Sequence, residues 1–319
     1  MRVALIVVVI VALGVGAWAL YGKLTAPDSQ LVPAWQLTQS SRYSGIGLTD
    51  PFISWSPDSR TVLFSVMDMR TREDMIYRWN VGENELQRIV PGASPNFLSA
   101  EEFVYLKREP KSLVARDLAS GREREFAPAI KRTQFWNEVT AFTYDPAAYT
   151  ITLRLIESTR YYTPGTEVYD TSGKRIGDVG TRLSEGIVDF SPNPDGSASA
   201  VLVQETEGAP LSLQIADKGR SRGKSILTGN LTSVAWSPDG ETIACGESVL
   251  VHALRPSDGK RLVVARFGDP DDPLEKRYVS RLSWSPDSKF LAVLLYVPSD
   301  MGDYPLIYVL SMSGLKWES

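Results

Sequence analysis

The chain has little of the two residue types that most often build reactive centres. Its 319 residues include one cysteine, Cys245, and one histidine, His252. A single cysteine excludes an intrachain disulfide framework, and a single histidine excludes a metal site made of several histidines from this chain. We therefore expect no metal and no cofactor, and the sequence names no catalytic residue.

An excess of positive charge is also missing. The chain carries 34 lysines and arginines against 38 aspartates and glutamates, a formal net charge of -4. Nucleic-acid-binding domains usually carry a positive field, so nucleic acid is not an expected partner. The densest basic run is KGRSRGK at Lys218–Lys224, which we interpret as a solvated hairpin. Contact with anionic headgroups or an acidic partner is the alternative.

One long stretch lacks charge altogether. Val3–Leu20 reads VALIVVVIVALGVGAWAL, and as a helix it would span about 27 Å, close to the hydrocarbon thickness of a bilayer. This predicts one N-terminal transmembrane helix, with residues 1–24 as a membrane anchor. The letters AWA at Ala17–Ala19 also fit a signal-peptidase site, but Trp18 and Tyr21 favour a segment that is retained.

The few charges around this segment predict its orientation. Arg2 precedes it and Lys23 follows it, and the weak positive-inside bias keeps the N-terminus cytoplasmic. The expected location is the inner membrane of a bacterial cell, single-pass, with the remainder of the chain on the periplasmic side. Residues 25–50 are predicted to be a polar linker, in which Trp35–Thr38 can form a short strand that closes a ring.

A short turn motif recurs along the remaining residues, 51–319. SWSPDS occurs at Ser54–Ser59 and Ser283–Ser288, AWSPDG at Ala235–Gly240, and DFSPNPDG at Asp189–Gly196. Proline fixes φ in a tight turn, aspartate accepts hydrogen bonds from nearby amides, and serine or glycine permits the exit. An aromatic residue before the turn, including Phe190, is expected to pack between neighbouring sheets. The predicted structural turn residues are Trp55, Pro57, Asp58, Trp236, Pro238, Asp239, Trp284, Pro286 and Asp287.

Six glycine turns alternate with these motifs, among them ASGRE at Ala119–Glu123 and SDGKR at Ser257–Arg261. They recur at intervals of roughly 40 to 55 residues, which suits a blade of four antiparallel strands. The predicted fold is all-β, a six-bladed β-propeller. The last blade is completed either by Leu315–Ser319 or by Trp35–Thr38, since an open sheet edge invites wrong pairing.

With these repeats the chain resembles the TolB-type β-propellers, a WD-repeat-like family whose repeats also form the non-catalytic propellers of prolyl-oligopeptidase-like enzymes. The resemblance runs from about Asp50 to the C-terminus and rests on SWSPDS and AWSPDG. It implies the fold and says little about function. The chain has no room for the small α/β domain that precedes the propeller of TolB, so TolB's partners are not carried over.

No enzyme is expected. Six blades leave no residues for an α/β-hydrolase domain, which a prolyl-oligopeptidase-like enzyme would need. His252 lies in the apolar text SVLVHALR and is predicted to be a structural histidine. Cys245 falls at the position where other blades place a core residue, so a buried, unreactive thiol is expected.

Loops offer the better candidates for function. In a four-stranded blade, the first and third turns open on one face, and the second turn and the connection to the next blade open on the other. The second set is longer and more varied here, and rigid scaffolds commonly carry function on such loops. The candidate partner-binding residues on these loops are Arg70, Arg72, Tyr161, Tyr162, Asp271, Asp272, Asp303 and Tyr304.

The sequence therefore predicts a membrane-anchored extracytoplasmic propeller that acts as a protein-binding or scaffold subunit of an envelope or membrane complex. Its expected partners are other membrane or envelope proteins, and the lipid bilayer through Val3–Leu20. One alternative is a propeller hydrolase or lyase acting on glycans or peptides in the central channel. Another is a small-ligand sensor.

Overall fold

The computed structural model describes most of the chain after residue 52, together with one short segment before it. The described residues are 34–36, 53–68, 73–83, 86–132, 139–145, 149–155, 166–178, 186–218, 220, 222–272, 276–298 and 304–317. Val3–Leu20, the predicted transmembrane helix, lies outside them. In the part of the chain that is described, no helix has both the length and the hydrophobicity needed to cross a bilayer.

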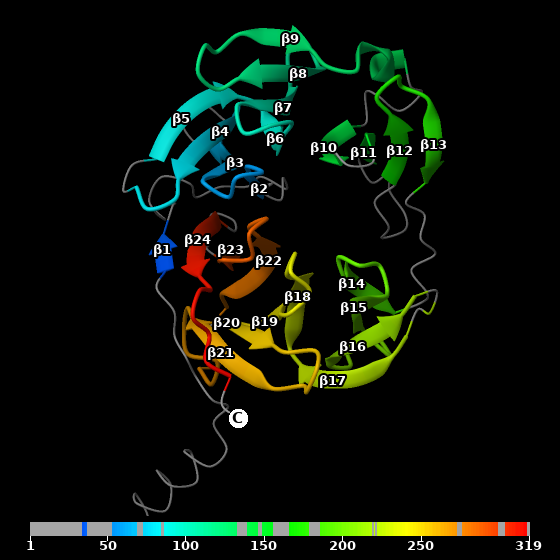
Figure 1. The fold of residues 1–319 in the computed structure, drawn as a ribbon, viewed down its shortest axis with the longest axis vertical. Helices are drawn as coiled ribbons and strands as arrows, with labels where there is room; N and C mark the ends of the chain where they lie inside the picture. The colour runs from blue at the N-terminus through cyan, green and yellow to red at the C-terminus, as the bar shows by residue number, and fades with distance from the viewer. Residues whose placement is uncertain are drawn as a thin grey trace, which may run out of the picture.

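The described residues form six sheets of four antiparallel strands, arranged around a ring (Figure 1). We number these sheets as blades 1 to 6. The strands of the first three blades are β2 (Ile53–Trp55), β3 (Thr61–Asp68), β4 (Glu73–Asn80) and β5 (Leu86–Pro91); β6 (Ala93–Phe97), β7 (Glu102–Lys107), β8 (Ser112–Asp117) and β9 (Glu123–Glu125); and β10 (Val139–Asp145), β11 (Thr150–Leu155), β12 (Thr166–Asp170) and β13 (Arg175–Asp178). A short 3-10 helix, η2 (Pro128–Arg132), lies between blades 2 and 3.

Blades 4 and 5 repeat the same plan. Their strands are β14 (Ile187–Pro192), β15 (Ala198–Val203), β16 (Leu211–Asp217) and β17 (Lys224–Gly229), then β18 (Leu231–Trp236), β19 (Ile243–Glu247), β20 (Leu250–Leu254) and β21 (Arg261–Arg266). In blades 1 to 5, each strand pairs with the next one along the chain, so the sheet order follows the chain order.

Blade 6 is built from both ends of the described chain. Its first three strands are β22 (Tyr278–Trp284), β23 (Phe290–Val297) and β24 (Tyr304–Ser311), and the fourth is β1 (Ala34–Gln36). Trp35 of β1 is in register with Val309 of β24. Of the two closures that the sequence allowed, the structure has the N-terminal one, and residues 315–317 form no strand.

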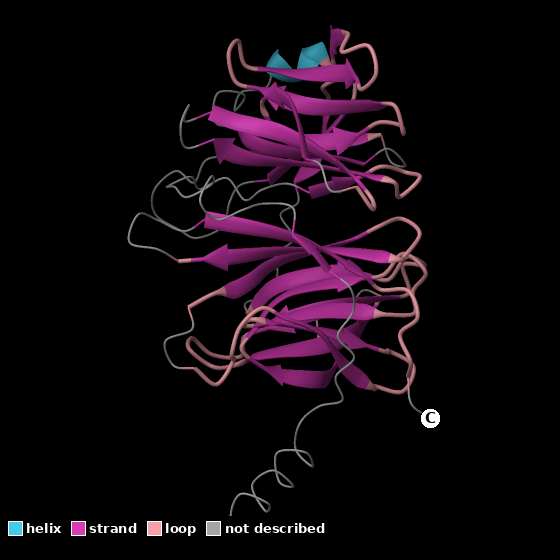
Figure 2. Ribbon diagram, turned by 90° about the vertical axis from the view of Figure 1, so that its left-hand side faces the viewer, coloured by secondary structure: helices cyan, strands magenta, loops and turns pink. Residues whose placement is uncertain are grey.

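The connections lie on two opposite faces of the ring (Figure 2). The first turn of each blade and the third turn of blades 1 to 5, such as residues 56–60 and 118–122, are short, and we call their side the turn face. The second turns and the connections between blades make up the loop face. These vary from residue 92 alone, between β5 and β6, to residues 156–165 between β11 and β12.

The hydrophobic core lies between neighbouring blades. Phe64 of blade 1 packs in one cluster with Leu294 and Ile307 of blade 6, and Leu106 of blade 2 packs in another with Leu153 of blade 3. Comparable clusters join blades 1 and 2, 4 and 5, and 5 and 6. Because each sheet buries one face against the next, a single blade has too little core to be stable alone.

The repeated Ser-Pro-Asp motif forms a closed hydrogen-bond unit within each turn. The buried hydroxyl of Ser56 donates to Oδ1 of Asp58 at 2.6 Å and accepts the amide of Thr61 at 2.9 Å. The same pattern is present around Ser237 and Ser285. These bonds satisfy the backbone of a turn that precedes a buried strand, which explains why serine, proline and aspartate recur together.

The aromatic residue before each turn differs between blades. Trp284 is buried, and its Nε1 donates to the carbonyl of Ala235 in blade 5, 3.0 Å away. Trp55 makes the same kind of bond to Ser283 of blade 6 at 3.1 Å. Phe190, which we expected to pack between sheets, is 43% exposed. That expectation is wrong because, among the described residues, no core cluster joins blade 4 to blade 3.

Candidate binding cleft between blades 1 and 2

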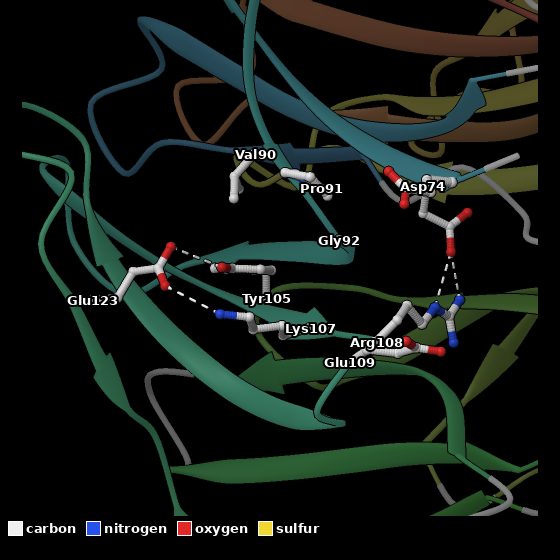
Figure 3. A pocket seen from close by; sticks show the side chains of 10 residues that line it. Asp74, Val90, Pro91, Gly92, Tyr105, Lys107, Arg108, Glu109 and Glu123 are labelled. Atoms are coloured by element: carbon white, nitrogen blue, oxygen red, sulfur yellow. Dashed lines mark hydrogen bonds and ion pairs between the residues drawn. The ribbon is translucent and has the colours of Figure 1, made fainter. Parts of the chain in front are cut away.

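A cleft of about 750 Å³ opens where blade 1 meets blade 2, in the outer part of the ring (Figure 3). It is formed by the start of β4, the end of β5, the linking residue Gly92, strand β7, the turn that follows it, and the start of β9. The residues that line it are Glu73, Asp74, Val90, Pro91, Gly92, Tyr105, Lys107, Arg108, Glu109 and Glu123. Since the start of β4, the end of β5 and the β7–β8 turn lie where those strands meet the loop face, the cleft opens on the loop face.

One end of the cleft is held by an ion pair between the blades. Nη2 and Nε of Arg108, in the β7–β8 turn, donate to Oδ2 of Asp74 at 2.7 and 3.0 Å. Asp74 is buried and Arg108 is about one-third exposed. Burial, together with the positive charge of Arg108, lowers the pKa of nearby Lys111. The pair connects the start of β4 in blade 1 to the β7–β8 turn of blade 2.

The opposite end is held by Tyr105 and Glu123, both of blade 2. The hydroxyl of Tyr105 donates to Oε1 of Glu123 at 2.9 Å, Nη1 of Arg116 donates to the same oxygen at 2.6 Å, and Nζ of Lys107 lies 3.7 Å from Oε2. Burial, and then the hydrogen bond to Glu123, raise the pKa of Tyr105 well above its usual range. Burial acts to raise the pKa of Glu123, but the bonds from Tyr105 and Arg116 outweigh it and lower that pKa. Near neutral pH the tyrosine therefore stays neutral and the carboxylate ionised.

A glycine makes the wall between these ends possible. Gly92 has a φ of 152°, and a Cβ built on it would lie 2.4 Å from Cδ2 of Tyr105. No side chain fits there unless the ring moves. The absence of a side chain at residue 92 therefore lets the Tyr105 ring lie flat against the backbone that joins the two blades.

Of the three predicted partner-binding residues that the structure describes, Asp271, Asp272 and Tyr304, none lines this cleft. Asp271 and Asp272 are exposed in the β21–β22 connection, on the loop face between blades 5 and 6, where their amides bond to Asp269. Tyr304 begins β24 and is in register with Val297. Arg70, Arg72, Tyr161, Tyr162 and Asp303 lie outside the described residues. Asp271 and Asp272 thus lie on the same face of the ring as the cleft.

His252 and Cys245 face each other across β19 and β20 in the core of blade 5. Nε2 of His252 lies 2.7 Å from Oε2 of Glu247, and no partner for its Nδ1 lies within the described residues. Burial raises the pKa of the Cys245 thiol far above its usual value. Among the described residues, no group of three or more histidine, cysteine or acidic side chains is placed to hold a metal ion.

The letters Gly-x-Ser-x-Gly occur at residues 219–223, between β16 and β17. The flanking strands β16 and β17 are antiparallel neighbours, whereas a hydrolase nucleophile elbow joins a strand to a helix.

No family model matches the chain, and no curated protein sequence matches it. Several solved structures share its fold. Oligogalacturonate lyase from Vibrio parahaemolyticus aligns with a TM-score of 0.51 and 13% identity, over 91% of this chain and 99% of the lyase. A structure of oligogalacturonate lyase in complex with manganese gives the same values. TolB from Acinetobacter baumannii aligns with a TM-score of 0.48 and 16% identity, over 80% of this chain and 65% of TolB.

At these identities the likeness concerns the fold alone. It extends over nearly the full length of the lyase chains, which are β-propellers, as TolB is. The six four-stranded sheets and the likeness to oligogalacturonate lyase confirm the architecture expected from the Ser-Pro-Asp repeats: the described part of this chain is a β-propeller.

Proposed function

We propose that the chain is a binding subunit that recognises a partner protein through its loop face and catalyses no reaction of its own. The observation that carries this proposal is the cleft between blades 1 and 2, which has two fixed ends, an apolar wall and charged side chains. Binding sites of this kind are concave and largely preformed, with a few polar groups that give specificity.

The electrostatics of the cleft favour recognition over catalysis. General acids and bases need a pKa close to the working pH. The pKa of Tyr105 is raised and the pKa of Glu123 is lowered, so both pKa values lie further from neutral pH than those of the free side chains. Both groups are thus held in one protonation state, which suits a fixed surface for a partner.

The proposed setting is the extracytoplasmic side of a bacterial inner membrane, with Val3–Leu20 as the anchor and other envelope or membrane proteins as partners. The uncharged length of this segment supports the anchor. An anchored domain meets its partners in two dimensions, so a moderate affinity suffices for assembly.

Site-directed photo-crosslinking in cells tests the proposal. A photo-reactive phenylalanine is placed at Pro91, which is exposed on the loop face and lines the cleft, or at Ser120, which is exposed on the turn face. We expect a discrete cross-linked band in the membrane fraction from Pro91 and none from Ser120. Equal labelling from both positions, or recovery of only the free chain from both, would refute a loop-face partner.

A further inference from the structure

We propose that the cleft between blades 1 and 2 accepts an extended segment of the partner carrying lysine or arginine, with the cationic end placed between Glu73 and Glu109. This assignment rests on the proposed binding function and adds the chemical class of the ligand. Its basis is the negative charge of Glu73 and Glu109, which line the cleft and take no part in the ion pairs described there.

Among the described residues that line the cleft, negative charges outnumber positive ones. Four carboxylates, those of Glu73, Asp74, Glu109 and Glu123, face two cations, those of Lys107 and Arg108. Both cations are engaged: Arg108 with Asp74, and Lys107 with Glu123. An anionic ligand would have to break one of these pairs, so the lining disfavours it.

Two carboxylates remain available to a ligand. Glu73 begins β4 in blade 1, and Glu109 follows β7 in blade 2; both are exposed. Within the described residues, neither side chain has a hydrogen bond or an ion pair. They come from the two blades that form the walls, so a cation placed between them contacts both sides of the cleft. An ammonium or guanidinium group there would be attracted by both carboxylates.

The apolar wall suits the stem of the same side chain. Val90 and Pro91 end β5 on one side, and the buried ring of Tyr105 lies against Gly92. Lysine and arginine bury their methylene stems along apolar surface while the charged end stays at a polar rim. The cleft offers that sequence of surfaces, with the aliphatic groups of Val90 and Pro91 within and carboxylates at the ends. A purely acidic patch would attract any cation, whereas this cleft also favours a cation that carries an aliphatic stem.

Peptide binding to the full chain in detergent tests the assignment. The probe is a fluorescein-labelled heptapeptide, Gly-Leu-Lys-Leu-Lys-Leu-Gly, and the comparison is the same peptide with glutamates in place of the lysines. Fluorescence anisotropy is measured for the wild type, for Glu73→Gln with Glu109→Gln, and for Glu101→Gln with Glu241→Gln. The last variant removes two exposed carboxylates from the turn face, so its change in net charge is identical.

We expect the lysine peptide to bind the wild type and the glutamate peptide not to bind. The Glu73→Gln, Glu109→Gln variant should bind roughly five- to tenfold more weakly, as two partly exposed ion pairs are lost. The turn-face variant should match the wild type. Because both pairs of positions are exposed, all the variants should keep the wild-type melting temperature, which is recorded alongside.

Each other outcome overturns the assignment. Equal loss in the two double variants would mean attraction by net charge alone, and preference for the glutamate peptide would mean the opposite ligand class. The proposed function is judged separately, by the cross-link from Pro91. If that cross-link forms and the lysine peptide does not bind, the function stands and the cationic segment is wrong. If neither is seen, both fail.

Discussion

The hydroxyl of Ser59, in blade 1, accepts a hydrogen bond from the backbone amide of Asp287, in blade 6, with an N–O distance of 3.0 Å. In the same way, the hydroxyl of Ser288 in blade 6 accepts a hydrogen bond from the backbone amide of Asp239 in blade 5, also at 3.0 Å. The last serine of the SPDS motif therefore reaches the motif of the neighbouring blade. In blade 5 the corresponding residue is Gly240, and a Cβ there would lie 3.3 Å from Oδ1 of Asn193 in blade 4.

This contact makes a prediction about Ser59, which has a φ of 60°. Ser59→Ala keeps the unfavourable φ and loses the hydrogen bond, and should destabilise the fold by about 1 kcal/mol. Ser59→Gly also loses the bond but relieves the φ strain, which is worth about 1 kcal/mol, so it should be close to neutral. Urea unfolding measures both. Ser248 has a φ of 50° and a hydroxyl with no partner in the described residues, so Ser248→Ala should change nothing. A penalty for Ser248→Ala as large as that for Ser59→Ala would contradict this account.

The closing strand can be tested by shortening the chain. A chain that begins at residue 38 lacks β1 and leaves the edge of β24 unpaired, whereas one that begins at residue 30 keeps it. We expect the shorter chain to be about 2 kcal/mol less stable, at roughly 1 kcal/mol for each net hydrogen bond lost. It should also associate with itself through the open edge. Thermal unfolding and size-exclusion chromatography give the two readouts. Identical behaviour of the two chains would mean that β1 contributes nothing to the ring.

Gly92 should be intolerant of any side chain because the ring of Tyr105 occupies the space. We expect Gly92→Ala to destabilise the chain by about 2 kcal/mol or more, since the ring must shift in a packed environment. Gly82→Ala is the matched control, because Gly82 also has a positive φ, 87°, but has nothing within 4 Å of a built Cβ. That variant should show only the φ strain, about 1 kcal/mol. Equal penalties in urea unfolding would argue against the clash.

The contact between Glu247 and His252 predicts a pH dependence of stability. The hydrogen bond from His252 lowers the pKa of Glu247 below its ordinary value of 4.5, although burial opposes it. A carboxylate whose folded pKa is depressed contributes stability that is complete above its unfolded pKa and is lost as the pH falls through its folded pKa. Glu247→Gln should therefore cost most near pH 7 and progressively less below about pH 4.5. Urea unfolding at several pH values measures this. A cost that grows as the pH falls would reverse the sign and refute the argument.

The repeats were readable from the sequence because their chemistry is local. Ser56, Pro57 and Asp58 form one turn within a few residues, so the letters and the structure coincide. The described closing strand is Ala34–Gln36, which overlaps the predicted Trp35–Thr38 at Trp35 and Gln36; residues 37 and 38 lie outside the described residues. Its pairing with β24 joins distant parts of the chain, and the sequence left two closures open because an edge strand can be completed from either end.

The cleft could not be read from the sequence. Asp74 and Arg108 meet across two blades, and neither stands in a motif. The exposure of Phe190 could not be predicted from the sequence either, because an aromatic side chain before a turn is buried only if the neighbouring blade covers it. The one feature of the sequence that could have pointed to the cleft is Gly92, a single glycine between two strands. At this residue the backbone leaving blade 1 passes the ring of Tyr105 in blade 2.

The closure of blade 6 has a consequence for biosynthesis. Ala34 is in register with Leu310, so β1 leaves the ribosome long before its partner exists. At roughly 5–20 residues per second, the wait is on the order of 15 to 55 seconds. Blades 1 to 5 can assemble during translation, but the circle becomes complete only once the carboxyl-terminal residues are released. Until then β1 is an unpaired strand open to capture by chaperones or by another nascent chain.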